Sequence, residues 1–109
     1  MKNHSLEKIS EVTIEQIRGI TNEHWAKKAS ALIVITGVFE RTTIKYTNRG
    51  YRYVLLEAGH LAQNFYLIAP SIGLNISALG GYVDNKVNEL IDVDGLGEST
   101  IYMFAVGEA

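Results

Sequence analysis

The stretch "RGYRYVLLEAGHLAQNFYLIAPSIG", residues 49–73, decides the fold predicted for this chain. Apolar side chains recur in it at intervals of three and four, which predicts a long helix with one apolar stripe. The stripe consists of Val54, Ala58, Leu61, Phe65, Ile68 and Ile72. Pro70 lacks a backbone N–H and Gly73 tolerates a left-handed backbone, so we expect the helix to kink or end near Ala69, with Gly73 as its C-cap.

A polar stripe runs along the same predicted helix. Its members, spaced four, three and four residues apart, are Tyr53, Glu57, His60 and Asn64. They could form a proton relay or a hydrogen-bonded interface between helices. Because buried polar groups need partners whatever their function, we favour the structural explanation. His4 and His24 lie too far from His60 in sequence to count as co-ligands, so no metal site is predicted.

Short helices are predicted on both sides of this long segment. Thr13 is an N-cap candidate, and Gly19 with residues 21–22 divides the segment after it into two short helices. Asp84 is the expected N-cap of a further short helix at residues 85–91.

Three strands complete the predicted order, which is α, β, long α, β, α, β. Residues 31–39 and 100–107 are apolar, uncharged runs typical of strands covered on both faces. Residues 75–82 predict a strand that runs into a double-glycine turn. About four helices of these lengths barely suffice to cover the two apolar strands on both faces, so the chain is expected to form part of a larger sheet or interface.

The overall composition is that of an ordinary globular domain. The 109 residues are enough for one domain, with 47% hydrophobic and 20% charged residues. A net charge of −2 gives no electrostatic reason to expect nucleic acid or a membrane surface as partner. There is no cysteine, and the first ten residues contain no apolar segment typical of a secretory signal. We therefore expect a cytoplasmic protein.

Three local features could carry chemistry. Lys45 and Tyr46 are adjacent, and an ammonium beside a phenol is a usable proton-transfer pair. From these residues alone we favour the structural explanation, a surface lysine next to a half-buried tyrosine. Arg49 and Arg52 begin the long helix and could clamp an anion, or form ion pairs with carboxylates such as Glu40 or Glu57.

The third feature is the pair Gly80 and Gly81, which precedes a capped helix. Two glycines there would let a ligand approach the backbone closely, with amide groups directed at it. Double glycines are also common in turns, so this signal is weak by itself.

Taken together, three segments resemble the nitroreductase superfamily of flavoenzymes, and within it the SagB-type dehydrogenases that oxidise azolines to azoles. They are "VFERTTIKYTNRGYRYVLLEAGHLAQNFYL" (residues 38–67), "GLNISALGGYVDNKVNELIDVDG" (residues 73–95) and "IYMFAVG" (residues 101–107). The resemblance runs from about residue 4 to residue 107. It identifies residues 1–109 as a single truncated nitroreductase-like domain, corresponding to the C-terminal half of family members about twice as long.

The resemblance implies an α+β fold, with a mixed sheet flanked by helices and a long central helix at a subunit interface. It implies bound FMN, with Lys45 and Tyr46 matching the pair associated with dehydrogenation. Leu79, Gly80 and Gly81 match the turn that passes close to the flavin ring. Two phosphate-binding features do not match: the arginine-rich N-terminal motif, and a basic residue after the last strand, where this chain has Glu108.

Three hypotheses follow from this resemblance. The chain could be the small or partial subunit of an FMN-dependent enzyme that acts on a peptide-derived substrate with a larger nitroreductase-like partner. It could instead be a non-catalytic scaffold half-domain that has lost FMN binding. A third possibility is a homo-oligomer that holds a different small ligand in the remnant cleft.

Overall fold

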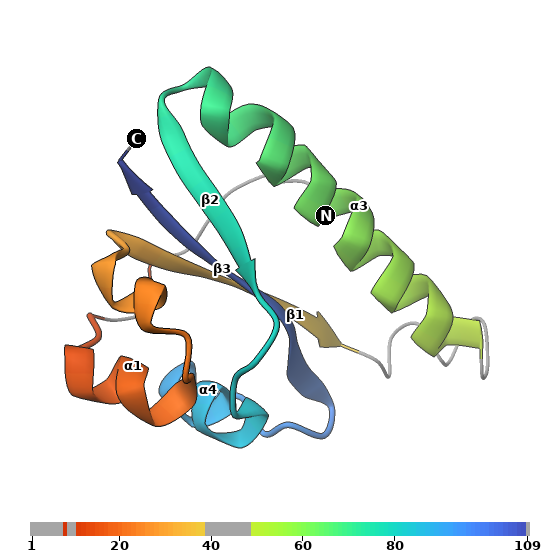
Figure 1. Cartoon of the computed structure of the whole chain (residues 1–109). Coiled ribbons are helices and arrows are strands. Elements are labelled where there is room, and N and C mark those ends of the chain that lie inside the picture. Colours follow the sequence, from red (N-terminus) through yellow and green to blue (C-terminus); the bar gives the residue numbers. More distant parts are fainter. Residues whose placement is uncertain (1–7, 9–10, 39–48, 109) are drawn as a thin grey trace.

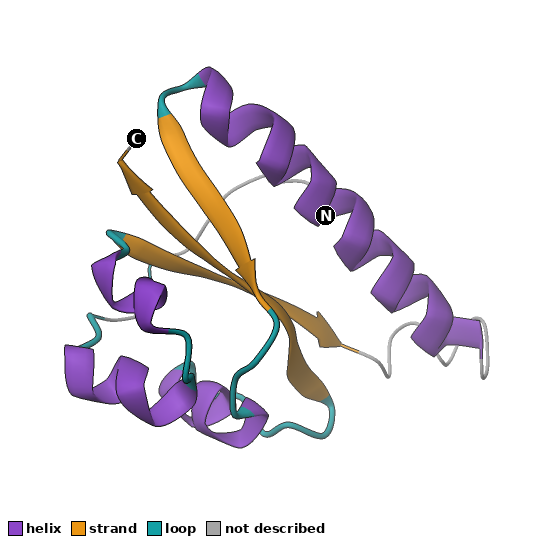
Figure 2. Cartoon of the chain, in the orientation of Figure 1, coloured by secondary structure: helices purple, strands orange, loops and turns teal. Residues whose placement is uncertain are grey.

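The computed structural model describes residue 8 and the ranges 11–38 and 49–108. The elements, in chain order, are α1 (Ile14–Ile20), the 3₁₀ helix η1 (His24–Lys28), β1 (Ala31–Val38), α3 (Arg49–Ser71), β2 (Leu74–Leu79), α4 (Asp84–Leu90) and β3 (Glu98–Glu108). Figure 2 shows helices and strands in these proportions, with α3 much the longest helix. The predicted order of elements is confirmed.

The described strands form one antiparallel sheet in the order β1-β3-β2. α3 lies along one face of this sheet, and α1 and α4 lie on the other (Figure 1). This is an α+β arrangement, as predicted. Both pairings among these three strands are antiparallel, so a parallel pair, which a mixed sheet requires, is not among them.

The face covered by α1, η1 and α4 carries a compact apolar core, which we call the closed face. Its buried members are Ile17, Ile20, Ala26, Leu79, Val87 and Met103. Leu79, Val87 and Met103 are each only 1% exposed. Leu32 and Val34 of β1 pack against this cluster from the sheet. Short amphipathic helices therefore suffice to cover this face.

The face covered by α3, which we call the open face, is packed more thinly. Phe104 is fully buried beneath the rings of Phe65 and Tyr66, at centroid distances of 5.5 and 5.9 Å. The buried residues of α3 are Gly50, Ala58, Ala62 and Ala69. Small residues on the helix thus meet one large aromatic residue on the sheet.

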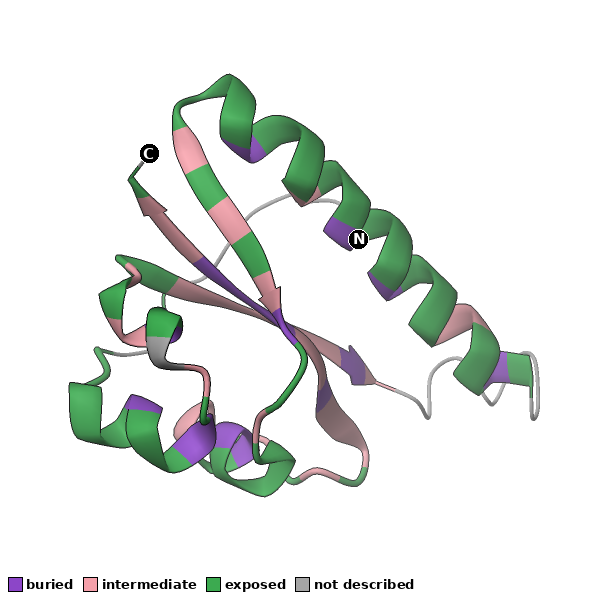
Figure 3. Cartoon of the chain, viewed as in Figure 1, coloured by how far each residue is buried: buried purple, intermediate pink, exposed green. Residues whose placement is uncertain are grey.

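The predicted apolar stripe of α3 is only partly correct. Ala58 is buried, and Val54 and Phe65 are half-buried. Leu61, Ile68 and Ile72 are exposed instead, as Figure 3 shows for most of the helix. α3 also carries apolar residues outside the predicted stripe, such as Leu55 and Leu67, so the periodicity alone did not identify the side that meets the sheet. Within the described residues, no helix combines the length and apolarity needed to cross a bilayer.

The helix ends follow the expected chemistry with one exception. The Thr13 hydroxyl accepts the N–H of Gln16, and the Gln16 side chain accepts the N–H of Thr13, which completes a capping box. Gly73 has φ +81° two residues after α3 ends at Ser71, the left-handed conformation expected of a glycine that terminates a helix. The prediction of Asp84 as N-cap was wrong, because α4 begins at Asp84 and the capping position is Val83.

A bulge in β3 turns one side chain toward α3. Ile35 pairs with Tyr102 and Thr36 with Thr100, so Ile101 is the extra residue. A Cβ atom on Gly37 would lie 2.3 Å from the Ile101 side chain and 2.8 Å from that of Val54. Gly37 is therefore required by the packing of this chain itself.

Candidate functional site

The candidate site is built on the connection between β2 and α4, residues 80–83, which we call the strap. The strap leaves the sheet at Leu79, whose side chain is 1% exposed and belongs to the closed-face core. Leu79 could therefore offer only its backbone to a ligand. Gly80 and Gly81, which follow, are both exposed.

The end of α1 holds the strap in place. The Val83 N–H donates to the carbonyl of Ile20 over 2.7 Å, which satisfies one of the carbonyls left free at a helix C-terminus. The Thr21 hydroxyl donates to the carbonyl of Gly81 over 2.5 Å. The same hydroxyl accepts the N–H of Glu23 at 3.1 Å. Two bonds thus fix the strap on the side that faces α1.

The other side of the strap is open. A Cβ atom built on Gly80 or Gly81 would meet no atom within 4 Å. Positive φ among the described glycines occurs only at Gly73 and Gly95, so neither strap glycine adopts a conformation that requires glycine. Nothing in the fold of the described residues explains these two glycines, in contrast to Gly37.

Tyr82 connects the strap to the sheet. Its hydroxyl donates to the carbonyl of Ile101, the bulge residue, over 3.0 Å. Burial raises the pKa of Tyr82 above its usual value near 10.0, and the neighbouring Asp84 and Tyr102 add to this effect. The phenol therefore stays protonated and acts as a neutral donor at physiological pH.

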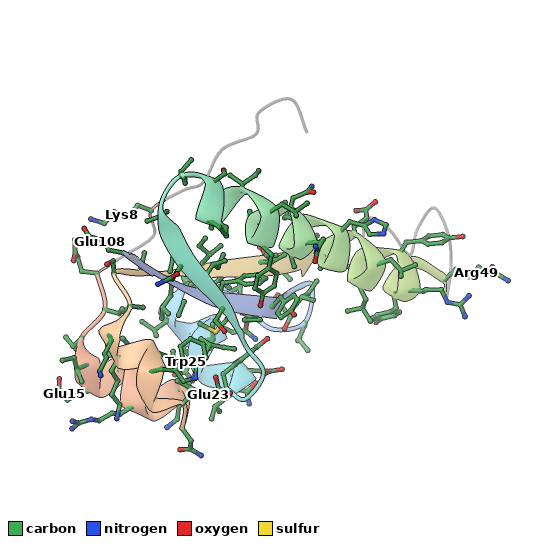
Figure 4. All side chains as sticks on the ribbon, turned by 45° about the horizontal axis from the view of Figure 1, so that its top comes forward. Lys8, Glu15, Glu23, Trp25, Arg49 and Glu108 are labelled. Carbon is green, nitrogen blue, oxygen red and sulfur yellow. The ribbon has the colours of Figure 1, made fainter. Side chains whose placement is uncertain are left out.

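The sequence-predicted site residues are not all brought together. Lys45 and Tyr46 lie outside the described residues. Figure 4 shows Arg49 at the far end of α3, away from α1 and η1. The one salt bridge among the described residues joins Lys8 and Glu11, so the alternative ion pair of either arginine with Glu57 is not formed.

The polar stripe of α3 is largely solvated. Glu57, His60 and Asn64 are exposed, whereas Tyr53 is half-buried. Glu57 borders a cavity of about 240 Å³ between α3 and the β1–β3 pair, whose other walls are mostly apolar. Within the described part of the chain, no three His, Asp or Glu side chains converge in a way that could hold a metal ion.

Thr21 is the site residue that sequence reasoning missed. It entered the prediction only as a divider between two short helices, yet its side chain is 6% exposed and bonded to the strap. The two partners lie 60 residues apart. A hydroxyl bond to a distant backbone carbonyl leaves no periodicity or motif, so no sequence signal could have identified it.

A family model gives this site a context. The protein-family model described as "Nitroreductase family" matches residues 3–108, nearly the whole chain. The chain belongs to the nitroreductase family. This confirms the resemblance drawn from residues 38–67, 73–95 and 101–107.

Individual relatives agree with this membership. The protein named Putative nitroreductase MJ1384 of Methanocaldococcus jannaschii is 36% identical over 94 residues, which are 84% of this chain and 48% of that protein. A crystal structure from Anabaena variabilis, named as a putative nitroreductase, is similar with a TM-score of 0.79 and 29% identity. That match covers 87% of this chain and 20% of the other.

A further relative belongs to the microcin system of Escherichia coli. Microcin B17-processing protein McbC is 36% identical over 78 residues, which are 72% of this chain and 28% of McbC. A chain in the structure of the microcin synthetase McbBCD complex with truncated pro-MccB17 bound has a TM-score of 0.75 and 24% identity, over 96% of this chain and 41% of that one. The chain thus spans about half, or less, of the curated relatives it matches.

Proposed function

We propose that this chain is part of an FMN-dependent oxidoreductase that dehydrogenates a peptide-derived substrate, such as an azoline, together with a partner subunit. The observation that carries the proposal is the open pair Gly80 and Gly81. Neither backbone conformation nor packing within the described residues requires these glycines. A planar ring lying against the strap would require them, because any side chain would hold it away.

The strap fits a flavin ring better than the chain fits a flavin phosphate. Open glycines beside exposed backbone amides suit a flat, polar-edged ring. A phosphate dianion needs Arg or Lys contacts, whereas Glu108 is exposed at the end of β3, where the resemblance leads us to expect a basic residue. The proposal therefore assigns phosphate binding to residues contributed by the partner.

Dehydrogenation removes one hydride and one proton from the substrate. When bound, FMN supplies the acceptor to which the hydride passes. Lys45 and Tyr46 are the proposed proton-transfer pair, since the positive charge of the Lys45 ammonium lowers the cost of deprotonating the Tyr46 phenol and the resulting phenolate can accept the substrate proton. The strap's contribution is to hold the ring at a fixed distance from the sheet.

Two findings support the peptide substrate and the partner. McbC is named a microcin-processing protein, and the structure of the McbBCD complex holds a truncated pro-microcin peptide. α3 also exposes large apolar side chains, including Leu55, Leu67 and Ile68 at 54%, 64% and 57%. A solvent-exposed helix of this kind marks a contact surface. We place the assembly in the cytoplasm, since a chain that has no cysteine and so no disulfide fits a reducing compartment.

Flavin content tests the proposal directly. The chain is produced alone and together with the products of neighbouring genes, and each preparation is separated by size exclusion while flavin absorbance is followed. Flavin that elutes only with a partner supports the split enzyme, and flavin that elutes with the chain alone supports a homo-oligomer. Colourless protein in every preparation excludes the enzymatic function and leaves the scaffold half-domain.

A substitution in the strap tests the observation itself. Gly81→Val places a side chain where the structure has open space, so we expect unchanged folding but at least a tenfold loss of FMN affinity, about 1.4 kcal/mol or more. Ser77→Val, at an exposed position of β2, is the control and should bind FMN normally. Equal FMN affinity in both variants would remove the strap from the flavin site.

The proton-transfer pair is tested separately. Lys45→Ala and Tyr46→Phe should keep the flavin bound and lower turnover by about 10²–10⁴-fold, the usual contribution of a general base. Lys28→Ala, on the exposed side of η1, is a matched charge-removal control. Turnover that stays at the wild-type rate in both variants would end the proposed role of the pair without affecting the family membership.

A further inference from the structure

We infer that Thr21 is a positioning residue for the proposed flavin site, because it fixes which edge of the strap faces the ring. The inference rests on the function proposed above. Its starting point is the bond from the buried Thr21 hydroxyl to the Gly81 carbonyl, the one side-chain bond of the described residues that reaches the strap from α1.

The bonds along this part of the chain alternate in direction. The Ala78 N–H points away from β3, since it donates to the hydroxyl of Tyr66 over 2.8 Å. The carbonyl of Gly81 and the N–H of Val83 point the other way, to Thr21 and Ile20. The peptide plane that Thr21 holds is the one between Gly81 and Tyr82, so this bond fixes the direction of both its carbonyl and its N–H.

The backbone N–H groups of Gly80 and Tyr82 are available to a ligand. Among the hydrogen bonds of the described residues, none uses the N–H of Gly80 or of Tyr82. The peptide between Gly81 and Tyr82 is trans, so a carbonyl held toward Thr21 directs the Tyr82 N–H to the opposite side. The Thr21 hydroxyl thus determines where a donor is presented to the acceptor atoms of a ring bound on the strap.

The orientation of the Thr21 hydroxyl is itself fixed. It accepts the N–H of Glu23, which leaves its proton directed at Gly81. Thr21 also caps the end of α1, with its own N–H bonded to the carbonyl of Ile17. A residue that can neither rotate nor move away is suited to holding one peptide plane.

The test compares three variants with the wild type. Thr21→Val removes the hydroxyl with little change of shape, and Thr21→Ser keeps it. Thr100→Val is the matched control, because Thr100 is equally buried at 6% and donates its hydroxyl to Asn88 of α4 and not to the strap. The first measurement is the dissociation constant of FMN, from flavin fluorescence, for each chain in complex with its partner.

We expect Thr21→Val to weaken FMN binding about fivefold, the effect of one misplaced hydrogen bond. Thr21→Ser and Thr100→Val should stay within about twofold of the wild type. Equal weakening by Thr21→Val and Thr100→Val would show an effect of general stability and overturn the inference. Unchanged binding in Thr21→Val would also overturn it, and the proposed function would stand.

A second measurement needs no flavin. In the chain alone, the amide resonances of Gly81 and Tyr82 should move in Thr21→Val and stay in place in Thr21→Ser. Unmoved resonances in Thr21→Val would overturn the positioning role. If no preparation of the wild type binds FMN, the proposed function fails, and this spectrum still decides whether Thr21 orients the strap.

Discussion

The two faces of the sheet differ in how completely this chain covers them. On the closed face, Leu79, Val87 and Met103 are each 1% exposed beneath α1, η1 and α4. On the open face, α3 buries Phe104 completely but leaves its own Leu67 64% exposed and its Ile68 57% exposed. Among the described residues, the short helices thus leave fewer large apolar side chains in solvent than the longest helix does.

The helices on the two faces differ in how their apolar side chains are distributed. α1 and α4 bury apolar residues on the side that meets the core, namely Ile17, Ile20 and Val87, and expose mostly polar residues elsewhere. α3 carries exposed apolar residues away from the sheet, among them Leu55, Leu67 and Ile68, beside its exposed polar stripe. The outer side of α3 is therefore a mixed surface, which the proposed partner or a second copy would cover.

The largest effect is expected on the closed face. Met103→Ala removes a fully enclosed side chain and should lower the free energy of unfolding by about 2–5 kcal/mol. Leu67→Ala on the open face should change it by less than about 0.5 kcal/mol. Urea denaturation of both variants measures the contrast. Similar losses of unfolding free energy in the two variants would show that the difference in burial between these residues has no counterpart in stability.

A substitution on the outer side of α3 should weaken association with the partner and leave the folding stability of the chain unchanged. Leu67→Glu places a charge on an exposed apolar surface, so we expect unchanged stability of the chain and about tenfold weaker binding of its partner. Sedimentation velocity of the mixed subunits measures the binding. Asn85→Glu on α4 adds the same charge at an exposed position and serves as the control. Partner binding as tight as that of the wild type would remove α3 from the interface.

Sequence reasoning reached the fold because its signals are local. The predicted N-cap Thr13 bonds a residue only three positions away, and Gly73 lies two residues after the helix that it ends. The N-cap of α4 was misplaced by one residue, because Asp84 has a suitable side chain but sits in the first turn. Such errors at element ends are expected when the capping bond itself is not visible in the sequence.

The site was less accessible to sequence reasoning. Gly80 and Gly81 were identified as a turn that a ligand could approach, but only the structure shows that nothing in the described residues crowds them. Which side of α3 meets the sheet depends on Phe104 and the neighbouring strands, so Ile68 and Ile72 could not be placed from their spacing. Thr21 acts through a bond to a residue 60 positions away, and no local pattern encodes it.

The smallest effect concerns Tyr82, the strap residue that packs against the closed-face core. Its pKa is raised above 10.0, chiefly by burial and secondarily by Asp84 and Tyr102. The unfolded chain therefore releases this proton at a lower pH than the folded chain does. The stabilisation is fully present below the unfolded pKa near 10 and is lost as the pH rises through the folded pKa.

Denaturation of the wild type and of Tyr82→Phe from about pH 8 to about pH 11 measures this loss, since the substitution removes only the titrating hydroxyl. Below about pH 10 the difference in unfolding free energy between the two should be constant, and it should reflect the lost bond to Ile101. Above that pH the wild type should lose stability faster than the variant. Parallel curves over the whole range would mean that Tyr82 is solvated in solution, and that the closed face does not extend to the strap.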